Sequence, residues 1–531
     1  MNRIFTLLFF MCFLAFTSQA QNERYLDEVF DDVVVTDTMG YGENTTVILA
    51  PNFIKRPLFY NFYEPEGDTE ELRPLIVLFH TGNFLPRLIN GQISGSLEDQ
   101  YIVNLSERLA RMGYCVAIVD YRKGWNPISD IQEVRTNTLI NAAYRGVQDS
   151  RTAARYFRLT AAAFGNPHRI DPNKIVAWGT GTGGYISLAT ASLDEYNDVV
   201  LPKFIGSNGL PMVLEQINGD INAEAVGVIP GTTDTLCYPN FAGLGLNSDF
   251  QLSVNMGGAM GDSSWLDADD IPMISFHVPS DPSAPYTEGI LIVPTTGDLV
   301  VEVQGSYAVQ EKANAIGVQD VFKNGVSFND EYTAVANSRN NGLEGLFPMP
   351  RPNWPNTAGE LEAVESGPWE TWDAEFWAMS QPQQCTDLGV PLSLCNWHLL
   401  GLASNPDMSQ EKGTAYLDTI LGYYGPRACV ALDLPCKSLF ANVAVEEIEL
   451  DTDLVSAFPN PTSATLTVRA EQQRTIDKIN LYNVEGQLVQ TYTNLVVTQK
   501  NIDVTNFNNG LHIMKVYFED GVVTKKVMIQ K

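Results

Sequence analysis

Histidine and the basic amino acids are scarce in this chain of 531 residues. It contains 5 histidines, and its 33 lysines and arginines face 63 aspartates and glutamates, which leaves a net charge of −30. A chain this acidic repels the phosphates of nucleic acids and of anionic membranes, so we expect neither as a partner. No histidines, cysteines and carboxylates cluster with the spacing of a metal site, so no metal or other cofactor is predicted.

Long hydrophobic runs are absent after the first 20 residues. The start of the chain, MNRIFTLLFFMCFLAFTSQA, combines Arg3, an apolar run and a small residue, Ala20, at its end. This pattern predicts a signal peptide over residues 1–20 that is removed before Gln21. No later run approaches the roughly 18 apolar residues that a spanning helix needs, so no transmembrane helix is expected. The protein is therefore predicted to be exported.

Cysteines are also few: the chain has 7, one of them in the predicted signal peptide. An oxidising exterior allows disulfides. Short separations make Cys385 with Cys395, and Cys429 with Cys436, candidate pairs, although the sequence leaves the pairing open. Cys115 lies in an apolar segment and is expected to be a buried thiol.

Apolar segments alternate with segments of helical periodicity over most of the chain. The predicted strands are 75–79, 115–121, 174–178, 225–229, 272–278 and 299–304, and the predicted helices are 102–114, 139–160, 182–193 and 409–432. Strands that are apolar throughout are buried on both faces of a sheet. The alternation predicts an α/β fold with a mostly parallel sheet, which we assign to residues 21–439.

This periodicity is lost in residues 323–395, which are rich in Asn, Pro, Gly and Trp. A stretch of this length without periodicity is typical of an insertion or a lid. Trp369, Trp372 and Trp377 have the spacing of a core stripe on a short helix. Alternatively, Trp369 and Trp372 belong to a lid that offers aromatic faces to a hydrophobic or sugar-like substrate.

The last part of the chain, residues 440–531, has a different sequence pattern. Residues 440–455 are acidic and are interpreted as a linker. From 456 to 531, short alternating segments are separated by turns such as Asn509-Gly510 and Asp520-Gly521. Period two with frequent turns predicts a small all-β sandwich.

The segment AWGTGTGGY, residues 177–185, has the outline of a nucleophile elbow. An apolar strand ends in a glycine-rich turn, and a helix of small residues follows. In the motif G-x-S-x-G, the serine stands at the tip of a strained turn between strand and helix. Here that position is Gly181, which has no side chain to acylate.

Six segments within residues 70–435 resemble, in the right order, segments of the α/β-hydrolase superfamily, specifically its secreted carboxylesterase-like members. They are LFHTGNF (78–84), GYCVAIVDYRKGWNP (113–127), YRGVQDSRTAARYF (144–157), IDPNKIVAWGTGTGGY (170–185), IPMISFHVPSDPSAPY (271–286) and CNWHLLG (395–401). The resemblance implies Gly181 at the nucleophile position, Asp281 as the catalytic acid and His398 as the catalytic histidine. It also implies oxyanion donors at Thr182 and near Gly82.

Gly181 leaves three interpretations open. The first is a pocket that binds the carbonyl or acyl group of an ester-like small molecule or polymer without turnover. The second is a hydrolase whose nucleophile is Thr180 or Thr182, and the third is a hydrolase in which His398 and Asp281 activate a water molecule. The sequence therefore leaves the protein's status as an enzyme open.

Three other histidines are expected to have structural roles or none. His80 opens the segment assigned to the oxyanion loop and is expected to brace it. His277 stands at a strand end and is expected to be structural, and His168, in a turn, is expected to be exposed.

The C-terminal segment carries a second resemblance. FPNPTSATLTV, INLYNVEGQLV, NNGLHIMKVYFEDG and TKKVMIQK resemble the C-terminal sorting domain of type IX secretion in Bacteroidetes, over residues 456–531. This resemblance implies a bacterial protein that the type IX secretion machinery carries across the outer membrane. It would then stay at the cell surface or be released.

Overall fold

The computed structural model describes residues 23–49, 52–92, 94–292, 297, 299–349, 367, 373–387, 389–441, 449–484, 487–493 and 495–531. The predicted signal peptide and the two tryptophans of the predicted lid, Trp369 and Trp372, lie outside these residues. The chain divides into two units, Met1–Ala441 and Asn442–Lys531, and the division falls in the segment interpreted as a linker.

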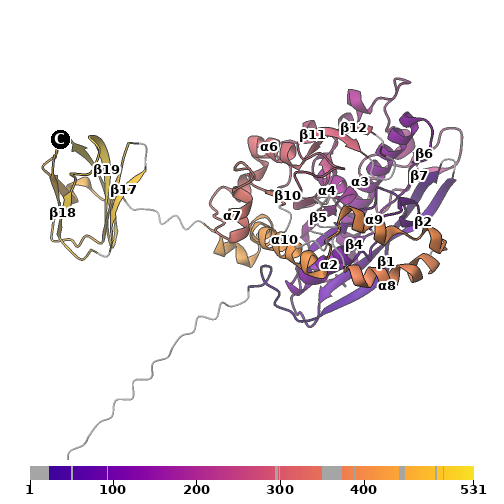
Figure 1. Ribbon diagram of the computed structural model, residues 1–531, viewed down its shortest axis with the longest axis horizontal. Coiled ribbons are helices and arrows are strands. Elements are labelled where there is room, and N and C mark those ends of the chain that lie inside the picture. The colour runs from indigo at the N-terminus through magenta and orange to yellow at the C-terminus, as the bar shows by residue number, and fades with distance from the viewer. Residues whose placement is uncertain are drawn as a thin grey trace, which may run out of the picture. The chain divides into compact units, whose positions relative to one another are not determined.

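The first unit is built on an eight-stranded sheet with helices around it (Figure 1). In spatial order its strands are β1 (Val33–Leu49), β2 (Asn52–Pro65), β4 (Cys115–Val119), β3 (Arg73–Phe79), β5 (Ile170–Thr180), β8 (Leu252–Met256), β10 (Met273–His277) and β13 (Leu346–Pro348). The β1–β2 and β2–β4 pairs are antiparallel, and every later pair is parallel. The predicted α/β class with a mostly parallel sheet is confirmed, and the order and the elbow described below are those of an α/β-hydrolase fold.

Each face of this sheet carries its own core. The helices α2 (Gln100–Arg111) and α10 (Gln410–Ala431) pack on one face, and α3 (Gln132–Ala163) packs on the other. Successive residues of a strand point to opposite faces, so Ile76 belongs to the first core and Val77 to the second. This double burial explains why β3 is apolar over almost its whole length.

Two predicted strands lie outside the central sheet. The segment 225–229 contains β6 (Gly227–Val228), which pairs with β7 (Thr235–Cys237). The segment 299–304 lies in β12 (Leu299–Gly305), which is antiparallel to β11 (Glu288–Ile292) and β9 (Ala259–Met260). These assignments to the main series were wrong, because an apolar run identifies a buried strand but not the sheet to which it belongs.

The central sheet instead contains β8 and β13, which the apolar pattern did not predict. In β8 the buried polar residues Ser253 and Asn255 interrupt the run. Ser253 donates to the Ser187 carbonyl at 3.0 Å, and Asn255 donates to the Ser306 hydroxyl at 2.9 Å, which satisfies both. β13 is only three residues long and lies inside the predicted insertion, so residues 323–349 belong to the α/β unit. The helix α7 (Glu331–Asn337) precedes β13, and α8 (Ala374–Asp387) follows the undescribed part of the insertion.

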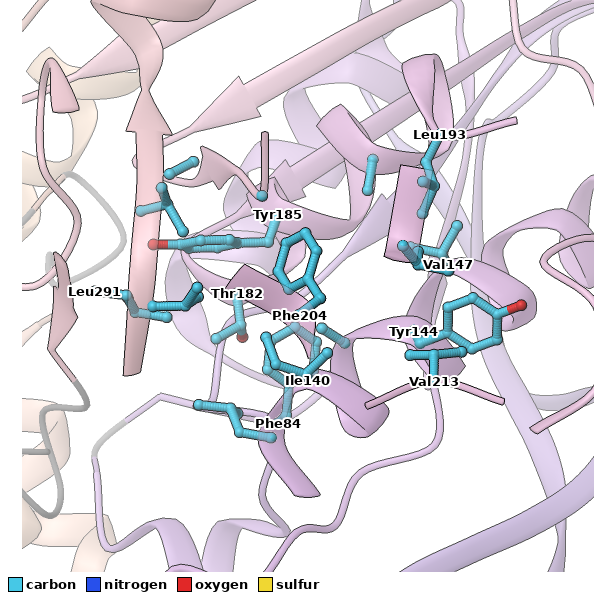
Figure 2. A pocket seen from close by; sticks show the side chains of 18 of the residues that line it. Phe84, Ile140, Tyr144, Val147, Thr182, Tyr185, Leu193, Phe204, Val213 and Leu291 are labelled. Carbon is cyan, nitrogen blue, oxygen red and sulfur yellow. The ribbon is translucent and has the colours of Figure 1, made fainter. Parts of the chain in front are cut away.

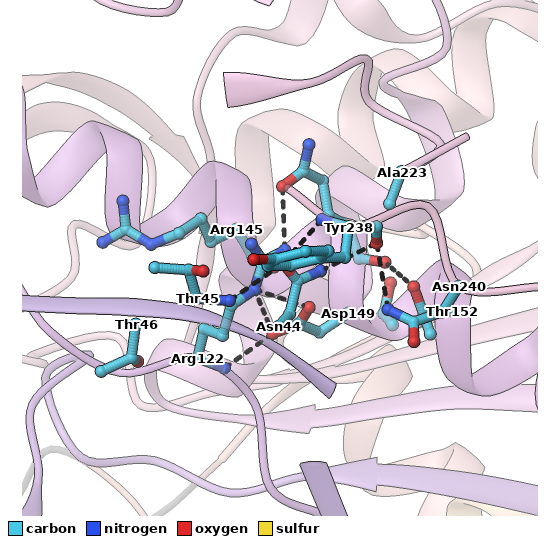
Figure 3. A network of polar contacts seen from close by, with 12 residues as sticks. Asn44, Thr45, Thr46, Arg122, Arg145, Asp149, Thr152, Ala223, Tyr238 and Asn240 are labelled. Atoms are coloured by element: carbon cyan, nitrogen blue, oxygen red, sulfur yellow. Dashed lines mark hydrogen bonds and ion pairs between the residues drawn. The ribbon is translucent and has the colours of Figure 1, made fainter. Parts of the chain in front are cut away.

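A buried polar network fixes the segment after β4 to α3 (Figure 3). The Arg122 Nε donates to Asp149 Oδ1 at 2.8 Å, and the Arg122 backbone N–H donates to Asp149 Oδ2 at 2.7 Å. Both side chains are fully buried. Burial raises the pKa of Asp149, although Arg122 opposes the shift. Each charge therefore depends on the other for its stability inside the protein.

Four cysteines of the first unit form two disulfides, Cys385–Cys395 and Cys429–Cys436, and Cys115 and Cys237 are free. Cys115 is a buried thiol, as expected, and burial raises its pKa to about 12. Such a thiol is unreactive at neutral pH. No helix in the described part of the chain is long and apolar enough to cross a membrane.

The second unit is an antiparallel β-sandwich, as predicted. One sheet has the order β14 (Val455–Phe458), β15 (Thr465–Ala470), β18 (Gln499–Asp503), and the other has the order β17 (Leu488–Tyr492), β16 (Lys478–Tyr482), β19 (Gly510–Phe518), β20 (Gly521–Ile529). Alternate residues of β19, including His512, Met514 and Val516, are buried. Period two in the sequence thus corresponds to one inward face.

Candidate functional site

The segment AWGTGTGGY forms a tight turn between β5 and α4 (Thr182–Ser192). Gly181 stands between them with φ 52° and ψ −117°, a conformation that strains any residue with a side chain. A Cβ on Gly179 would lie 1.8 Å from the Gly183 carbonyl oxygen, and one on Gly183 would lie 2.1 Å from the Phe79 oxygen. The glycines are therefore needed for the close packing of this elbow.

The place of a nucleophile on this elbow is filled by Thr81, which follows β3. A Cβ on Gly181 would lie 2.2 Å from Thr81 Oγ1 and 2.9 Å from Thr81 Cβ. Sequence analysis missed this residue. The signal was present, because Thr81 stands between His80 and Gly82 where carboxylesterases often have His-Gly-Gly. The Thr81 side chain thus occupies the space that a side chain at position 181 would need.

His80 anchors this loop from behind. Its ring is buried and stacks on Tyr121 with 4.8 Å between ring centroids, and the Tyr121 hydroxyl donates to the His80 carbonyl at 2.8 Å. The His80 Nε2 lies 3.6 Å from Asp120 Oδ1. Burial alone would raise the pKa of Asp120, but Lys123, His80 and Arg56 together hold it well below its usual range. Asp120 is therefore an anion under the loop, and His80 has the bracing position that we expected.

Four of the five residues assigned from the resemblance line one cavity at the elbow. These are Gly82, Gly181, Thr182 and Asp281, and Thr81 and Tyr185 lie beside them. They lie close together because each comes within a few residues of the carboxyl end of a parallel strand, and these ends share one edge of the sheet. We call this space the elbow cavity. No histidine is among the described residues that line it.

Asp281 is held by its own loop and lies near His277. Its Oδ1 accepts the backbone N–H groups of Ser283 at 2.7 Å and Ala284 at 3.1 Å, and its Oδ2 lies 3.9 Å from His277 Nε2. The His277 Nδ1 contacts the Ser306 hydroxyl at 2.8 Å, and Nε2 contacts the Ala284 carbonyl at 3.2 Å. Burial lowers the pKa of His277 to about 4, so this ring is neutral at neutral pH.

His398 lies on α9 (Trp397–Ser404) and does not line the elbow cavity. Its backbone N–H donates to Gln381 Oε1 of α8 at 2.5 Å. Its Nδ1 is buried and has no hydrogen-bond partner among the described residues. Burial lowers the pKa of this ring. Nothing in the described contacts connects His398 to Asp281, so the pairing implied by the resemblance stays a prediction.

The α8–α9 hairpin nevertheless packs on the loop that follows β3. Arg87, in the short helix α1 (Arg87–Asn90), lies over the ring of Trp377 at 5.2 Å and of Trp397 at 5.6 Å. It also donates to Gln384 Oε1 at 3.3 Å. The disulfide Cys385–Cys395 closes the hairpin. Trp377 is buried, and its contact with Arg87 holds the α8–α9 hairpin against the loop that follows β3.

An apolar pocket adjoins the elbow cavity (Figure 2). The two share Asn83, Thr182, Tyr185, Leu291 and Ile292. The other lining residues are almost all apolar and include Phe84, Ile140, Val147, Leu193, Phe204 and Val213. Where the two meet, the Tyr185 hydroxyl is buried without a hydrogen-bond partner among the described residues. Burial and the charge of Asp281 raise the pKa of Tyr185, so it is a protonated donor.

His168 is buried, and the expectation of exposure was wrong. Its Nε2 contacts the Tyr60 hydroxyl at 2.9 Å, and its ring centroid lies 4.2 Å from that of Phe62. Inward-facing aromatic residues of β2 cover this turn, which local sequence could not show. Among the described residues, no three histidine, cysteine or carboxylate side chains are placed to hold a metal ion.

Comparison with known proteins identifies the C-terminal unit. Residues 456–530 match the family described as "Secretion system C-terminal sorting domain". This domain implies handling by the type IX secretion machinery and marks the chain for secretion or attachment at the cell surface. The signal peptide predicted at the other end lies outside the described residues.

Just under half of the chain is similar to solved structures of esterase 2 from Thermogutta terrifontis. The form phosphorylated by paraoxon is 18% identical with a TM-score of 0.28, over 47% of this chain and 73% of that chain. The propionate-bound form is 17% identical with a TM-score of 0.27, over 47% and 74%. No curated protein matches this chain. The strand order and the elbow of the first unit are those of an α/β-hydrolase fold. The sorting domain marks the protein as exported.

Proposed function

We propose that this exported protein binds an acyl-bearing ligand and does not hydrolyse it by the serine route. One observation carries the proposal: the elbow has glycine where a nucleophile would stand, and Thr81 fills that place. The ligand's carbonyl or carboxyl end would lie in the elbow cavity, and its hydrocarbon part would lie in the apolar pocket that adjoins it.

The polar end of such a ligand would meet hydrogen-bond donors. The Tyr185 hydroxyl is buried at the junction of the two spaces and needs an acceptor. Thr182 is the first residue of α4, and backbone N–H groups in the first turn of a helix have no partner within the helix. Both features favour an oxygen acceptor or an anion at this point.

The hydrocarbon part would gain from leaving water. Each methylene group buried among side chains such as Ile140, Leu193 and Phe204 contributes about 0.8 kcal/mol to binding. An acyl chain of several carbons would therefore supply much of the affinity, while the polar end fixes its orientation.

The two hydrolytic interpretations have less support. The Thr180 hydroxyl is buried and contacts the Phe79 carbonyl at 3.4 Å, and the Thr182 hydroxyl contacts the Tyr121 hydroxyl at 3.3 Å. Neither has a histidine partner among the described residues. Water activation by His398 would need that ring in the elbow cavity, which its contacts on α8 and α9 do not favour.

The test uses the purified chain in three assays. Calorimetry with decanoate should give saturable binding, whereas p-nitrophenyl esters should not be turned over and a fluorophosphonate probe should not label the protein. Ala143→Phe, which fills the apolar pocket, should weaken decanoate binding at least tenfold, while the exposed Leu399→Ala on α9 should not change it. Ester turnover that disappears in His398→Ala would overturn the proposal.

A further inference from the structure

A third cavity lies against another face of α3. Asn137, Thr138, Asn141 and Arg145 line it, whereas Ile140, Tyr144 and Val147 of the same helix line the apolar pocket. The cavity shares no lining residue with the elbow cavity or the apolar pocket. We call it the Arg145 cavity. The proposed binding of an acyl-bearing ligand does not use it.

Arg145 brings a positive charge into this cavity without a carboxylate to balance it. Its side chain is buried, and its Nη2 donates to the Gly124 carbonyl at 2.6 Å. Among the described residues, its Nε–H has no hydrogen-bond partner and no carboxylate forms an ion pair with it. Asp149, one turn along α3, is instead paired with Arg122 at 2.8 Å. In Figure 3 the Arg145 guanidinium points away from that pair.

The surroundings of Arg145 disfavour its charged form. Burial and the neighbouring charge of Arg122 lower the pKa of Arg145 to about 9, although Asp149 opposes the shift. The side chain is still a cation at neutral pH. A buried cation without a counter-charge is costly, and a bound anion would relieve that cost.

Asn126 supplies a second polar group that lacks a partner. Its Oδ1 is buried without a hydrogen-bond donor among the described residues, while its backbone N–H donates to Thr138 Oγ1 at 3.1 Å. The neighbouring amides are satisfied: Asn141 donates to the Met212 carbonyl at 2.9 Å, and Asn218 donates to Asn141 at 2.5 Å. The cavity thus offers one cationic donor and one neutral acceptor.

We propose that the Arg145 cavity binds a small carboxylate that carries a neighbouring hydroxyl donor, the chemistry of a 2-hydroxy acid. The carboxylate would accept from Arg145, and the hydroxyl would donate to Asn126 Oδ1. Apolar walls that include Phe53, Trp125 and Leu236 would cover the carbon atoms. The cavity volume of about 170 Å³ suits a molecule of a few carbons.

Three matched probes test this site by titration calorimetry on the purified chain. Lactate has the carboxylate and the hydroxyl, propionate lacks the hydroxyl, and lactamide lacks the charge. Lactate should bind at least tenfold more tightly than either analogue, because propionate leaves Asn126 Oδ1 without a donor and lactamide leaves the charge of Arg145 unbalanced. Lactamide that binds as tightly as lactate, or an absence of lactate binding, would overturn the proposal.

Two variants assign the binding to this cavity. Arg145→Gln should abolish lactate binding, whereas Arg135→Gln on the same helix, which does not line the cavity, should preserve it. If Arg145→Gln does not fold, Asn126→Asp decides: it keeps the shape of the side chain but places a negative charge beside the ligand, so lactate binding should fall at least tenfold. Unchanged binding in the variant that folds would overturn the assignment.

Discussion

The apolar pocket and the Arg145 cavity lie against different faces of one helix, α3, and offer opposite chemistry. The pocket presents hydrocarbon surface and the hydroxyl of Tyr185, which is buried without a hydrogen-bond partner among the described residues. The Arg145 cavity presents a buried cation and an unpaired amide oxygen. The difference shows what each can select: the pocket selects ligands by buried apolar area, and the cavity selects them by charge and hydrogen bonding.

The polar face of α3 depends on the Arg122–Asp149 pair, so breaking this pair should have the largest effect. Asp149→Ala leaves the Arg122 charge buried without its partner, and the free energy of unfolding should fall by about 3–5 kcal/mol. Replacing both residues with apolar ones of similar volume, Arg122→Met with Asp149→Leu, should cost less than the single change. Urea denaturation measures both, and a cost below about 1 kcal/mol for Asp149→Ala would contradict this account.

The variant Gly181→Ser tests whether Thr81 fills the place of a nucleophile on the elbow. The new side chain meets Thr81 and takes a strained backbone, so the variant should lose about 3 kcal/mol of stability. Adding Thr81→Gly removes the steric conflict and should recover about 1–2 kcal/mol in a double-mutant cycle.

The same double variant tests the site. It has a serine on the elbow but no histidine among the described cavity residues, so p-nitrophenyl esters should stay intact. Ester hydrolysis that also requires His398 would show that the pairing implied by the resemblance is real.

The sequence predicted some strands of the central sheet and missed others. The strands β3, β4, β5 and β10 were predicted because each contains a mostly apolar run that is buried on both faces of the sheet. The strand β8 was missed because Ser253 and Asn255 are satisfied by partners far along the chain. The local apolar pattern of a sequence therefore predicts which segments are buried, but it does not predict which sheet a strand joins.

The candidate sites follow the same division. Gly181 and Asp281 were placed in one cavity because a motif and a strand end identify them. Thr81 was missed because its role depends on which loop crosses the elbow. Arg145 was missed because α3 is buried on all sides from Tyr144 to Arg155, and a segment with so many polar residues gives no sign of this in the sequence.

Lowering the pH should destabilise the fold near the elbow cavity, because His277 must then be protonated. Burial lowers the pKa of its folded form to about 4, below the ordinary value of about 6.5 for an unfolded chain. The unfolded chain therefore binds the proton first, so the stability contributed by neutral His277 is full above pH 6.5 and is lost as the pH falls toward 4.

Between pH 7 and pH 5 this loss should amount to about 2 kcal/mol, relative to a variant that cannot titrate at this position. Denaturation of the parent chain and of His277→Gln at the two pH values gives the difference directly. Parallel loss in both proteins would place the acid sensitivity elsewhere.

The smallest expected effect separates the two sources of affinity at the elbow. Tyr185→Phe keeps the ring that divides the cavity from the apolar pocket but removes the buried donor. Decanoate should bind about fivefold more weakly, which corresponds to the roughly 1 kcal/mol of one hydrogen bond. The gain per methylene between hexanoate and decanoate should not change, because the apolar walls are intact. If that gain falls while the overall loss is the same, Tyr185 acts by shaping the pocket and the ligand's polar end is bound elsewhere.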